Sequence, residues 1–264
     1  MKMLRAAVLL VFSFLLVFTG TGTVTGTGHQ KPKDLEIGEF FNGKEGTMVL
    51  KNLRNDQVYV YNQERSMQTF TPESTYKVPN ALIGLETAVV RDEYEVKHWD
   101  GVIREIEDWN RDHTLASGMR YSVIWYYQDM ARDIGEEQMQ HYVDLMQYGN
   151  QDISGGIDKF WLASSMEISA LEQVDFIERL VEDELPIEEK HQKTVKRMMI
   201  QDEQDEYTLH GKTGTRLSDF GLGWFVGFLE TEKTTWVYAV NIDGSGTEAK
   251  NITLETLKKK NIID

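Results

Sequence analysis

The amino-acid sequence predicts an α+β fold, an α/β/α sandwich in which both ends of the chain form an antiparallel sheet and an all-helical lobe is inserted between them. Two observations predict it. Apolar residues alternate with a period of two near residues 46–62 and again over residues 207–242, which is typical of strands. Between these regions they recur with the 3.6-residue period of helices. This order indicates two lobes, and the cleft between them is the expected place for a site.

The first 28 residues are predicted to be a targeting segment. Met1–Arg5 is short and basic, Ala6–Phe18 is apolar, and Thr19–Gly28 consists mainly of Thr and Gly. This order is typical of a secretory signal peptide, and the apolar run is shorter than the ~20 residues of a membrane-spanning helix. Because no Ala-x-Ala cleavage site is present, an uncleaved anchor is the alternative. The sequence therefore predicts one domain at residues 29–264 of a secreted or extracytoplasmic protein.

The N-terminal part of the domain is predicted to contain two strands and a long helix. Gly46–Leu53 and Asp56–Asn62 are rich in β-forming residues and are separated by a turn. A polar connection leads to a helix expected from about Ser74 to Val90, in which Pro79 is expected to disturb the geometry. Its buried stripe is predicted to be Ala81, Leu82, Leu85, Ala88 and Val89.

The middle of the chain is predicted to be mostly helical. Trp99–Asn110 and Asp152–Asp158 are expected to be loops, because both contain turn residues. Ser169 and Glu172 form a capping-box pattern at the start of one helix. The predicted helices are Ser122–Ile134, Glu136–Gln147, Ser169–Glu182 and Glu188–Ile200.

The C-terminal part returns to a period of two. Apolar residues at alternating positions put Trp224 and Val226 on one face of a strand and Phe225 on the other, so the sheet should be covered on both sides. The acidic run Asp202–Glu206 is expected to be a solvated loop. The last two strands should form an antiparallel hairpin, because a short loop joins them. The predicted elements are the strands Tyr207–Gly211, Gly221–Leu229 and Thr235–Ile242 and the helix Glu248–Asn261.

The composition narrows the classes of function. The formal net charge is −15, and without the basic first 28 residues it is more negative still, which argues against nucleic-acid binding. The chain has no cysteine, so disulfides, thiol chemistry and lipid attachment at cysteine are excluded. No metal ligand set is predicted either.

The most informative short motif is Ser74-x-x-Lys77. On a helix the two side chains share one face, so the amine can remove the hydroxyl proton and make a nucleophile. A serine at a helix start also has a backbone N–H free to bind an oxyanion. Such a pair is expected by chance roughly 0.7 times in this composition, so an ordinary helix start with a surface lysine is the alternative.

Three further segments carry candidate site residues. Ser122 precedes an apolar helix and by itself would be read as an N-cap. Lys212-Thr213-Gly214 follows a predicted strand, where the plain interpretation is a strand end with a turn glycine. Trp161 is apolar enough to be an ordinary core residue.

Taken together these segments resemble the serine penicillin-recognising enzymes, which carry Ser-x-x-Lys, a second Ser-x-(Asn or Val) and Lys-Thr-Gly in that order. The flanking segments narrow the resemblance to the class D beta-lactamases, the oxacillinases. It extends from about residue 68 to residue 227 and is carried by STYKVPNALIG (Ser74–Gly84), YGN (Tyr148–Asn150) and QDISGGIDKFWL (Gln151–Leu162). It implies hydrolysis of the beta-lactam ring of penicillins without a metal.

The resemblance implies a role for each matching side chain. Ser74 would be acylated, and Lys77, converted by carbon dioxide to N6-carboxylysine, would be the base in both half-reactions. Trp161 would donate its indole N–H to the carbamate. Ser122 would relay a proton to the departing ring nitrogen, and Lys212 would set the field around Ser122 and the substrate carboxylate.

The resemblance also implies how the substrate is held. The backbone N–H groups of Ser74 and Thr215 would bind the oxyanion, with Thr213 and Gly214 beside them on the strand. Tyr148–Asn150 would shape the site wall without transferring protons.

Three positions depart from the pattern of the family. Ile124 replaces the usual valine over the carboxylated lysine, so its extra methyl group puts the deacylation rate in doubt. Trp125 stands where proline is common. Lys250 lies in the context of the arginine that binds the substrate carboxylate, and it would bind as a point charge instead of a bidentate fork.

Other functions are weighed against a secreted hydrolase. A penicillin-binding sensor-type domain would be acylated but would deacylate very slowly, and the multiple spanning segments of such receptors are not seen in the sequence. A cell-wall transpeptidase and a binding protein without chemistry rank lower. Beta-lactam antibiotics are the expected partners, no membrane contact is expected beyond the signal segment, and a monomer or weak homodimer is predicted.

Overall fold

The computed structural model describes residues 31–264, so the predicted signal peptide at residues 1–28 lies outside the described residues. The strands of the main sheet are β1 (Lys33–Asp34), β2 (Gly46–Asn52), β3 (Gln57–Tyr61), β8 (Ile200–Glu203), β9 (Tyr207–Thr215), β10 (Gly223–Thr231) and β11 (Thr235–Ile242). Their order is β1-β3-β2-β11-β10-β9-β8, so strands from the two ends of the chain meet where β2 pairs with β11. All neighbours are antiparallel except β1 and β3. The predicted sheet topology is therefore confirmed.

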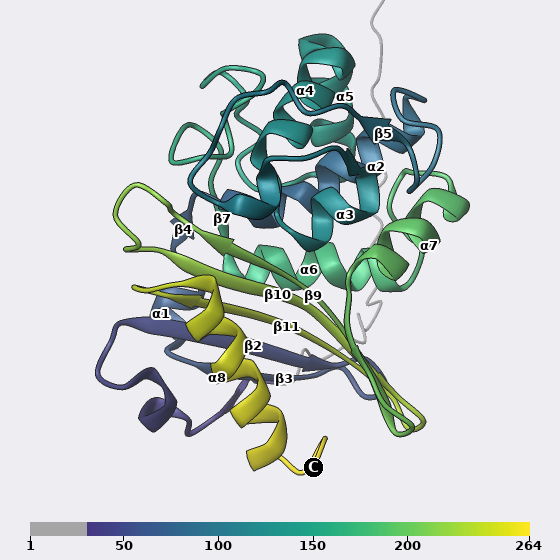
Figure 1. The fold of residues 1–264 in the computed structure, drawn as a ribbon. Coiled ribbons are helices and arrows are strands. Elements are labelled where there is room, and N and C mark those ends of the chain that lie inside the picture. The colour runs from purple at the N-terminus through teal and green to yellow at the C-terminus, as the bar shows by residue number, and fades with distance from the viewer. Residues whose placement is uncertain (1–30) are drawn as a thin grey trace, which may run out of the picture.

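A helical lobe occupies the middle of the chain and lies above the sheet (Figure 1). The α-helices and short 3-10 helices of this part of the chain are η2 (Glu73–Tyr76), α2 (Lys77–Glu86), η3 (Glu107–Trp109), α3 (Leu115–Arg120), α4 (Ile124–Ile134), α5 (Glu136–Met146), α6 (Ala170–Val181) and α7 (Glu189–Met198). The remaining elements are η1 (Gly38–Phe41), α1 (Gln63–Ser66), α8 (Gly246–Lys259) and the two-residue strands β4 (Thr69–Phe70), β5 (Val96–Lys97), β6 (His113–Thr114) and β7 (Ile168–Ser169).

Both faces of the sheet are buried. Helix α6 contacts β2, β10 and β11 on one face, and α8 covers β9, β10 and β11 on the other (Figure 1). Along β10 the side chains of Trp224 and Val226 join the large core shared with the helical lobe, whereas Phe225 joins the smaller core under α8. The alternation in the sequence predicted this division, because successive strand side chains point to opposite faces.

The helix predicted from Ser74 to Val90 is shorter than expected. It consists of the 3-10 turn η2 and helix α2, which ends at Glu86, and Ala88 is exposed with a φ of 56° instead of lying on the buried stripe. Pro79 is the third residue of α2. The N–H groups of the first helical turn have no intrahelical partner, so proline loses no hydrogen bond there. Pro79 therefore fits into α2 without the distortion that the sequence led us to expect.

The segment around Ser122 also differs from the prediction. An additional short helix, α3, ends at Arg120, and α4 begins only at Ile124 with Val123 at its N-cap. Ser122 therefore lies in the turn between two helices, with a φ of 56°, and not at the N-cap of α4. A hydroxyl that does not cap a helix is free for other partners.

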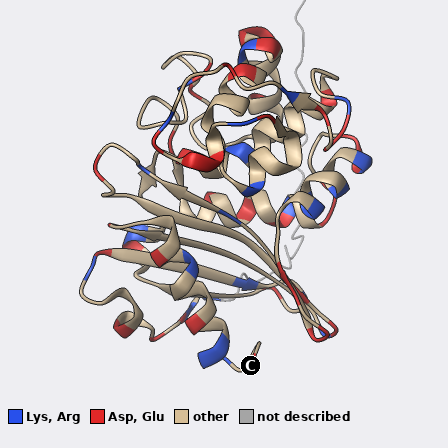
Figure 2. Cartoon of the chain, in the orientation of Figure 1, with Lys and Arg blue, Asp and Glu red and all other residues tan. Residues whose placement is uncertain are grey.

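The acidic run Asp202–Glu206 is a solvated loop only in its last three residues, which connect β8 and β9. Its first two residues belong to β8, the edge strand, which pairs with β9 through a bulge between Ile200 and Asp202. Figure 2 shows acidic residues gathered at the far tip of the β8–β9 and β10–β11 hairpins. Charges on an edge strand discourage pairing with other chains.

The remaining predicted elements are confirmed within a residue or two at most ends. The Ser169–Glu172 capping box is present at the start of α6, and the two hydrogen bonds that define it are both formed. Helix α8 begins two residues earlier than expected, with a second capping box between Ser245 and Glu248. Among residues 31–264, no helix has the length and apolar character needed to span a membrane.

Candidate active site

The turn that carries Ser74 lies where the sheet meets the helical lobe. Element η2 packs against β9 and β10 and runs directly into α2, so Ser74 and Lys77 fall on consecutive helical turns. Lys77 Nζ lies 2.9 Å from Ser74 Oγ and donates a hydrogen bond to it. Both side chains are buried, and Lys77 is only 1% exposed. The spacing in the sequence predicted this contact.

Burial lowers the pKa of Lys77 well below its ordinary value, and the neighbouring charge of Lys212 lowers it further. Glu73 acts in the opposite direction, but desolvation is the largest cause. Burial therefore favours the neutral form of the amine. A neutral amine can accept a proton or add to an electrophile, whereas an ammonium group can do neither.

Lys212 and Ser122 form a second pair. Lys212 Nζ donates to Ser122 Oγ over 3.0 Å and to the carbonyl oxygen of Thr213 over 2.8 Å. Burial lowers the pKa of Lys212 to about 7. The structure thus brings residue 212 of the sheet to residue 122 of the helical lobe.

Strand β9 continues to Thr215, so Lys212-Thr213-Gly214 is part of the strand and does not follow it as predicted. Gly214 faces the turn before Ser74 at close range: a Cβ atom there would lie 3.0 Å from the carbonyl oxygen of Pro72 and 3.2 Å from Cγ2 of Thr75. Only glycine permits this approach without a shift of the backbone. Thr215 Oγ1 accepts a hydrogen bond from the N–H of Gly246 at the start of α8.

Trp161 is fully buried against the same turn. Its ring stacks on Tyr76, with centroids 5.3 Å apart, and its carbonyl oxygen accepts the N–H of Glu73. The indole Nε1 is buried and has no hydrogen-bond partner among residues 31–264. An indole N–H can only donate, so this position calls for an acceptor.

The residues around Lys77 fit a carboxylated lysine on two counts. The amine is buried, which favours the neutral form that addition of carbon dioxide requires, and Trp161 offers a buried donor that has no partner among residues 31–264. Tyr148 lies behind this group, with its ring edge against Tyr76 and its hydroxyl near Gln173, 3.5 Å away. It therefore packs into the wall of the site, as expected for Tyr148–Asn150.

Ile124 begins α4 and is partly buried against the large core. Tyr127, three residues later on the same face of the helix, places its ring 5.4 Å from Lys77 Nζ. Ile124 therefore faces the side of α4 that looks toward Lys77.

The structure does not bring Lys250 to these groups. Its amine donates to Gln201 Oε1 on β8 over 2.9 Å and lies 5.9 Å from the ring centre of Phe225, in the core under α8. It makes none of the contacts that join Ser74, Lys77, Ser122 and Lys212. A role in binding the substrate carboxylate is not supported by this placement.

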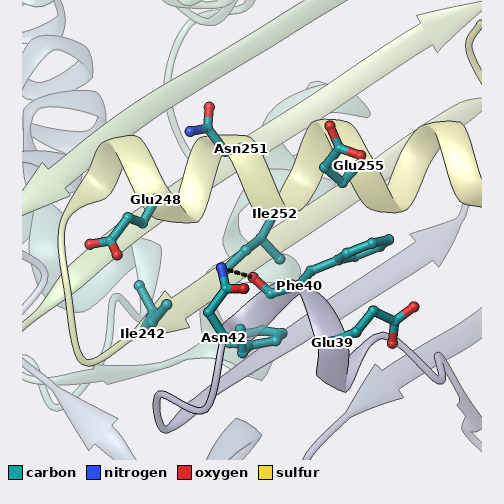
Figure 3. A pocket seen from close by; sticks show the side chains of 9 residues that line it. Glu39, Phe40, Asn42, Ile242, Glu248, Asn251, Ile252 and Glu255 are labelled. Carbon is teal, nitrogen blue, oxygen red and sulfur yellow. Dashed lines mark hydrogen bonds between the residues drawn. The ribbon is translucent and has the colours of Figure 1, made fainter.

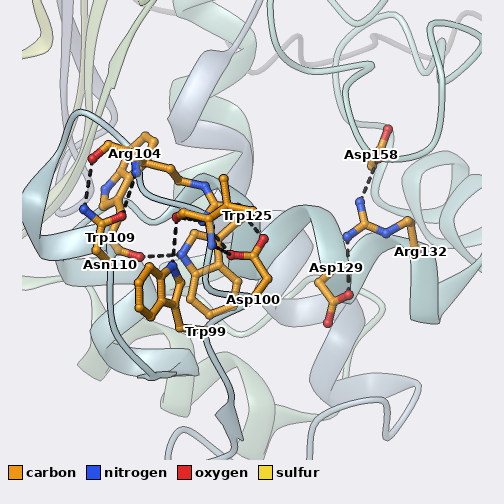
Figure 4. Close-up of polar contacts among 10 residues, drawn as sticks. Trp99, Asp100, Arg104, Trp109, Asn110, Trp125, Asp129, Arg132 and Asp158 are labelled. Atoms are coloured by element: carbon orange, nitrogen blue, oxygen red, sulfur yellow. Dashed lines mark hydrogen bonds and ion pairs between the residues drawn. The ribbon is translucent and has the colours of Figure 1, made fainter.

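A set of indole hydrogen bonds made by Trp109 and Trp125, both labelled in Figure 4, was not predicted from the sequence. Trp109 Nε1 donates to the carbonyl oxygen of Tyr121 over 3.0 Å, and Trp125 Nε1 donates to the carbonyl oxygen of Trp109 over 2.8 Å. Arg104, paired with Asp100, lies over the ring of Trp125. The departure from proline at position 125 thus supplies a donor that ties the 99–110 loop to α4. The cluster of tryptophans was the only signal for it.

A separate pocket of about 320 Å³ lies between η1 and α8 (Figure 3). It is on the face of the sheet opposite Ser74 and contains none of the predicted site residues. Its lining contains both apolar and acidic side chains, among them Phe40, Ile242, Ile252, Glu39, Glu248 and Glu255. Within residues 31–264 no group of three or more His, Asp or Glu side chains could hold a metal ion.

Comparison with known proteins finds a matching family model and several similar proteins. A family model described as the penicillin binding protein transpeptidase domain matches residues 42–263. The probable beta-lactamase YbxI of Bacillus subtilis is 57% identical over 235 residues, which cover 89% of this chain and 88% of that protein. The regulatory protein BlaR1 of Bacillus licheniformis is 34% identical over 279 residues, 98% of this chain but 46% of its own.

Among solved structures, the class D beta-lactamase BAT-2 superposes with a TM-score of 0.85 and 58% identity, covering 86% of this chain and 96% of that chain. Identity above one half over most of both chains, together with this TM-score, shows that the two proteins share the fold. The protein is thus a member of the class D beta-lactamase family, within the penicillin-binding transpeptidase domains.

Proposed function

We propose that this protein is a secreted serine beta-lactamase that hydrolyses the beta-lactam ring of penicillins through an acyl-enzyme on Ser74. The observation that carries the proposal is the 2.9 Å contact between Ser74 Oγ and the buried amine of Lys77, whose neutral form is favoured by burial. A neutral base in contact with a hydroxyl is the arrangement that activates a serine nucleophile. The similarity to YbxI and BAT-2 supports the same activity.

In the acylation step, Ser74 Oγ attacks the ring carbonyl carbon, the hydroxyl proton leaves toward residue 77, and the C–N bond of the ring breaks. Lys212 orients the Ser122 hydroxyl through their 3.0 Å contact, so that Ser122 can pass a proton to the departing nitrogen. The N–H groups of Glu73 and Thr75 already bind Trp161 and Pro72. The N–H of Ser74 lies between them and is the group that would hold the oxyanion together with that of Thr215.

Lys77 is proposed to carry a carboxyl group derived from carbon dioxide. When present, this carbamate supplies an anionic base beside Ser74 for acylation and for activation of the deacylating water. Trp161 would hold it through the indole N–H that has no partner among the described residues. Ile124 would lie over it and limit access of water, and Thr213 and Gly214 would line the substrate.

A sensor-type domain that deacylates very slowly is the second candidate. The similarity to BlaR1, which covers 98% of this chain and 46% of that protein, favours it, as does isoleucine at position 124, at the start of α4. The two candidates differ only in the fate of the acyl-enzyme. Localisation outside the cytoplasm is proposed from the first 28 residues alone.

The test is to follow one penicillin through both half-reactions. A fluorescent penicillin should label the wild-type protein and should not label Ser74→Ala, and unlabelled penicillin should be turned over many times per protein molecule. Persistent labelling of Ser74→Ala would remove Ser74 from its role. Stoichiometric labelling without turnover would instead favour the sensor.

Dependence on bicarbonate tests the modified lysine. Turnover should rise with added bicarbonate and should fall after degassing at low pH, where the lysine is decarboxylated. Turnover that is indifferent to both treatments would argue for an unmodified Lys77 as the base.

A further inference from the structure

Glu73 is a buried carboxylic acid for which neither the motif nor the proposed reaction provides a role. It directly precedes Ser74 and is only 3% exposed. Acidic side chains are rarely buried without a partner. The contacts of Glu73 therefore show what the carboxyl group does.

These contacts connect two segments that are 90 residues apart. Glu73 Oε1 accepts the N–H of Ala163 over 3.0 Å and the hydroxyl of Thr71 over 2.7 Å. In return, the N–H of Glu73 donates to the carbonyl oxygen of Trp161 over 3.0 Å. The backbone and side chain of one residue thus bind both ends of the Trp161–Ala163 turn, which forms a reciprocal clamp.

Both sides of this clamp have unfavourable backbone conformations. Glu73 has a φ of 52° and Ala163 a φ of 45°. Residues other than glycine adopt the left-handed region only at a cost of about 1 kcal/mol or more, and they stay there when neighbouring bonds hold them. The clamp supplies such bonds to both residues.

We propose that Glu73 is a positioning residue that fixes the Trp161–Ala163 turn against the Ser74 turn and thereby aims the Trp161 indole at the carboxylated Lys77. This inference rests on the proposed function and deepens it. Burial raises the pKa of Glu73, and the Thr71 hydroxyl and the Ala163 N–H oppose that rise. The acceptor oxygen is used in either protonation state, so the role depends on the oxygen and not on the charge.

Substitution of Glu73 by glutamine or by alanine distinguishes a role of the acceptor oxygen from a role of the negative charge. Glu73→Gln keeps an oxygen that can accept from Ala163 and Thr71, whereas Glu73→Ala removes it. Glu167→Ala is a matched control, because Glu167 is an exposed acid in the same part of the chain and, within residues 31–264, its carboxylate accepts a hydrogen bond from Thr69 alone. Thr71→Val removes one of the two donors and is a milder variant, should Glu73→Ala fail to fold.

Carbamate occupancy gives a readout that is independent of antibiotic turnover. With ¹³C-bicarbonate, the carbamate carbon of Lys77 should be visible by NMR, and its titration gives the half-saturating bicarbonate concentration. We expect this concentration to rise about tenfold in Glu73→Ala, as for a loss of sub-ångström alignment. It should rise less in Thr71→Val and should stay at the wild-type value in Glu73→Gln and Glu167→Ala. The ratio of deacylation to acylation rate should fall in the same order.

Three results would overturn the inference. The first is an unchanged half-saturating concentration in a folded Glu73→Ala or, if that variant does not fold, in Thr71→Val. The second is an equal loss in Glu73→Gln and Glu73→Ala, which would make the charge the important property. The third is a wild-type protein without a carbamate signal, which would refute the modified lysine as well, while labelling of Ser74 by penicillin would still stand.

Discussion

At the scale of single residues, burial gives Lys77 its chemistry. The amine lies 2.9 Å from Ser74 Oγ and is almost inaccessible to water, which lowers its pKa because little solvent stabilises the ammonium form. A lysine on the surface, three residues from a serine, would stay protonated and inert. The same residue pair thus acquires a function only through its surroundings.

Trp161 offers a test at this scale. Trp161→Phe removes the indole N–H and keeps most of the ring that stacks on Tyr76. A hydrogen bond to a charged group contributes about 1.5–3 kcal/mol, so we expect deacylation to slow by roughly 10- to 100-fold and acylation to slow less. Stopped-flow measurement of the two steps on one penicillin gives both rates. As a control, Trp236→Phe changes an indole under α8, far from Ser74. Equal slowing of both steps in Trp161→Phe would contradict the assignment.

Ile124→Val removes one methyl group from the face of α4 that looks toward Lys77. If this methyl group restricts the deacylating water, the variant should deacylate severalfold faster, with acylation unchanged. The cost in stability should be about 0.5–1.5 kcal/mol, as for other Ile to Val changes in partly filled cores. Burst kinetics measures the rate, and urea unfolding measures the stability. A deacylation rate equal to or below that of the wild type would show that Ile124 does not limit the water.

At the scale of elements, the site depends on the approach of strand β9 to the turn η2. Gly214 leaves little space for a side chain, since a Cβ would meet Pro72 and Thr75 at 3.0–3.2 Å and these neighbours would have to shift by a few tenths of an ångström. Both of these neighbours belong to the Ser74 turn, so the distance between strand and turn is set by this glycine.

Gly214→Ala should therefore push β9 away from η2. We expect a loss of about 1–3 kcal/mol in stability, as for other overpacked sites, and a larger fall in acylation rate than stability alone would explain. Gly221→Ala is the matched control in the adjoining connection, because there the new methyl group meets the flexible side chain of Arg216. Acylation that is equally affected by both substitutions would contradict the role of the strand position.

Also at the scale of elements, hydrogen bonds from tryptophan side chains stabilise the turn between α3 and α4. Ser122 has a φ of 56°, and the preceding carbonyl oxygen of Tyr121 is bound by Trp109, which Trp125 binds in turn (Figure 4). Strained residues persist where surrounding contacts fix them. The tryptophans thus explain how Ser122 can leave the helix and still present its hydroxyl to Lys212.

At the scale of the whole molecule, the site lowers the stability of the fold. Lys212 is buried with a pKa lowered to about 7, whereas in the unfolded chain it has the ordinary value of 10.5. Between these two values the unfolded state binds one more proton than the folded state at this residue. Protonation of Lys212 therefore does not favour the unfolded state above pH 10.5. As the pH falls from 10.5 toward 7, it lowers the free energy of unfolding by about 1.4 kcal/mol per pH unit.

Lys212→Met keeps an unbranched side chain of similar size and removes the titration. The variant should be more stable than the wild type near pH 7, by about 1 kcal/mol or more, and the gain should shrink toward pH 10. Urea unfolding at several pH values between 7 and 10 measures it, and penicillin turnover should be lost. Parallel pH dependence of the two proteins would show that Lys212 does not titrate in this range.

The charge of the whole molecule bears on its assembly. Acidic residues at the tip of the β8–β9 and β10–β11 hairpins, together with a net charge of −15, oppose self-association through that end (Figure 2). The monomer or weak homodimer expected from the sequence stays a prediction.

The sequence by itself determined the strand and helix periods, the two faces of β10 and the order of the motifs. Each of these depends on side-chain spacing along a short segment, which a regular helix or strand translates directly into position. Ser74 and Lys77 could be paired in this way, because three residues separate them on one helical face.

Only the tertiary structure decided what joins distant segments. The contact of Lys212 with Ser122, the clamp of Glu73 and the contact of Lys250 on α8 with Gln201 on β8 all depend on how separate elements pack. The same holds for the Trp161 indole, which has no partner among residues 31–264. The left-handed conformations of Glu73, Ser122 and Ala163 also had no local signal, because none of them is a glycine. Long-range packing fixes these residues against their intrinsic preference, so reading neighbours along the chain could not reveal them.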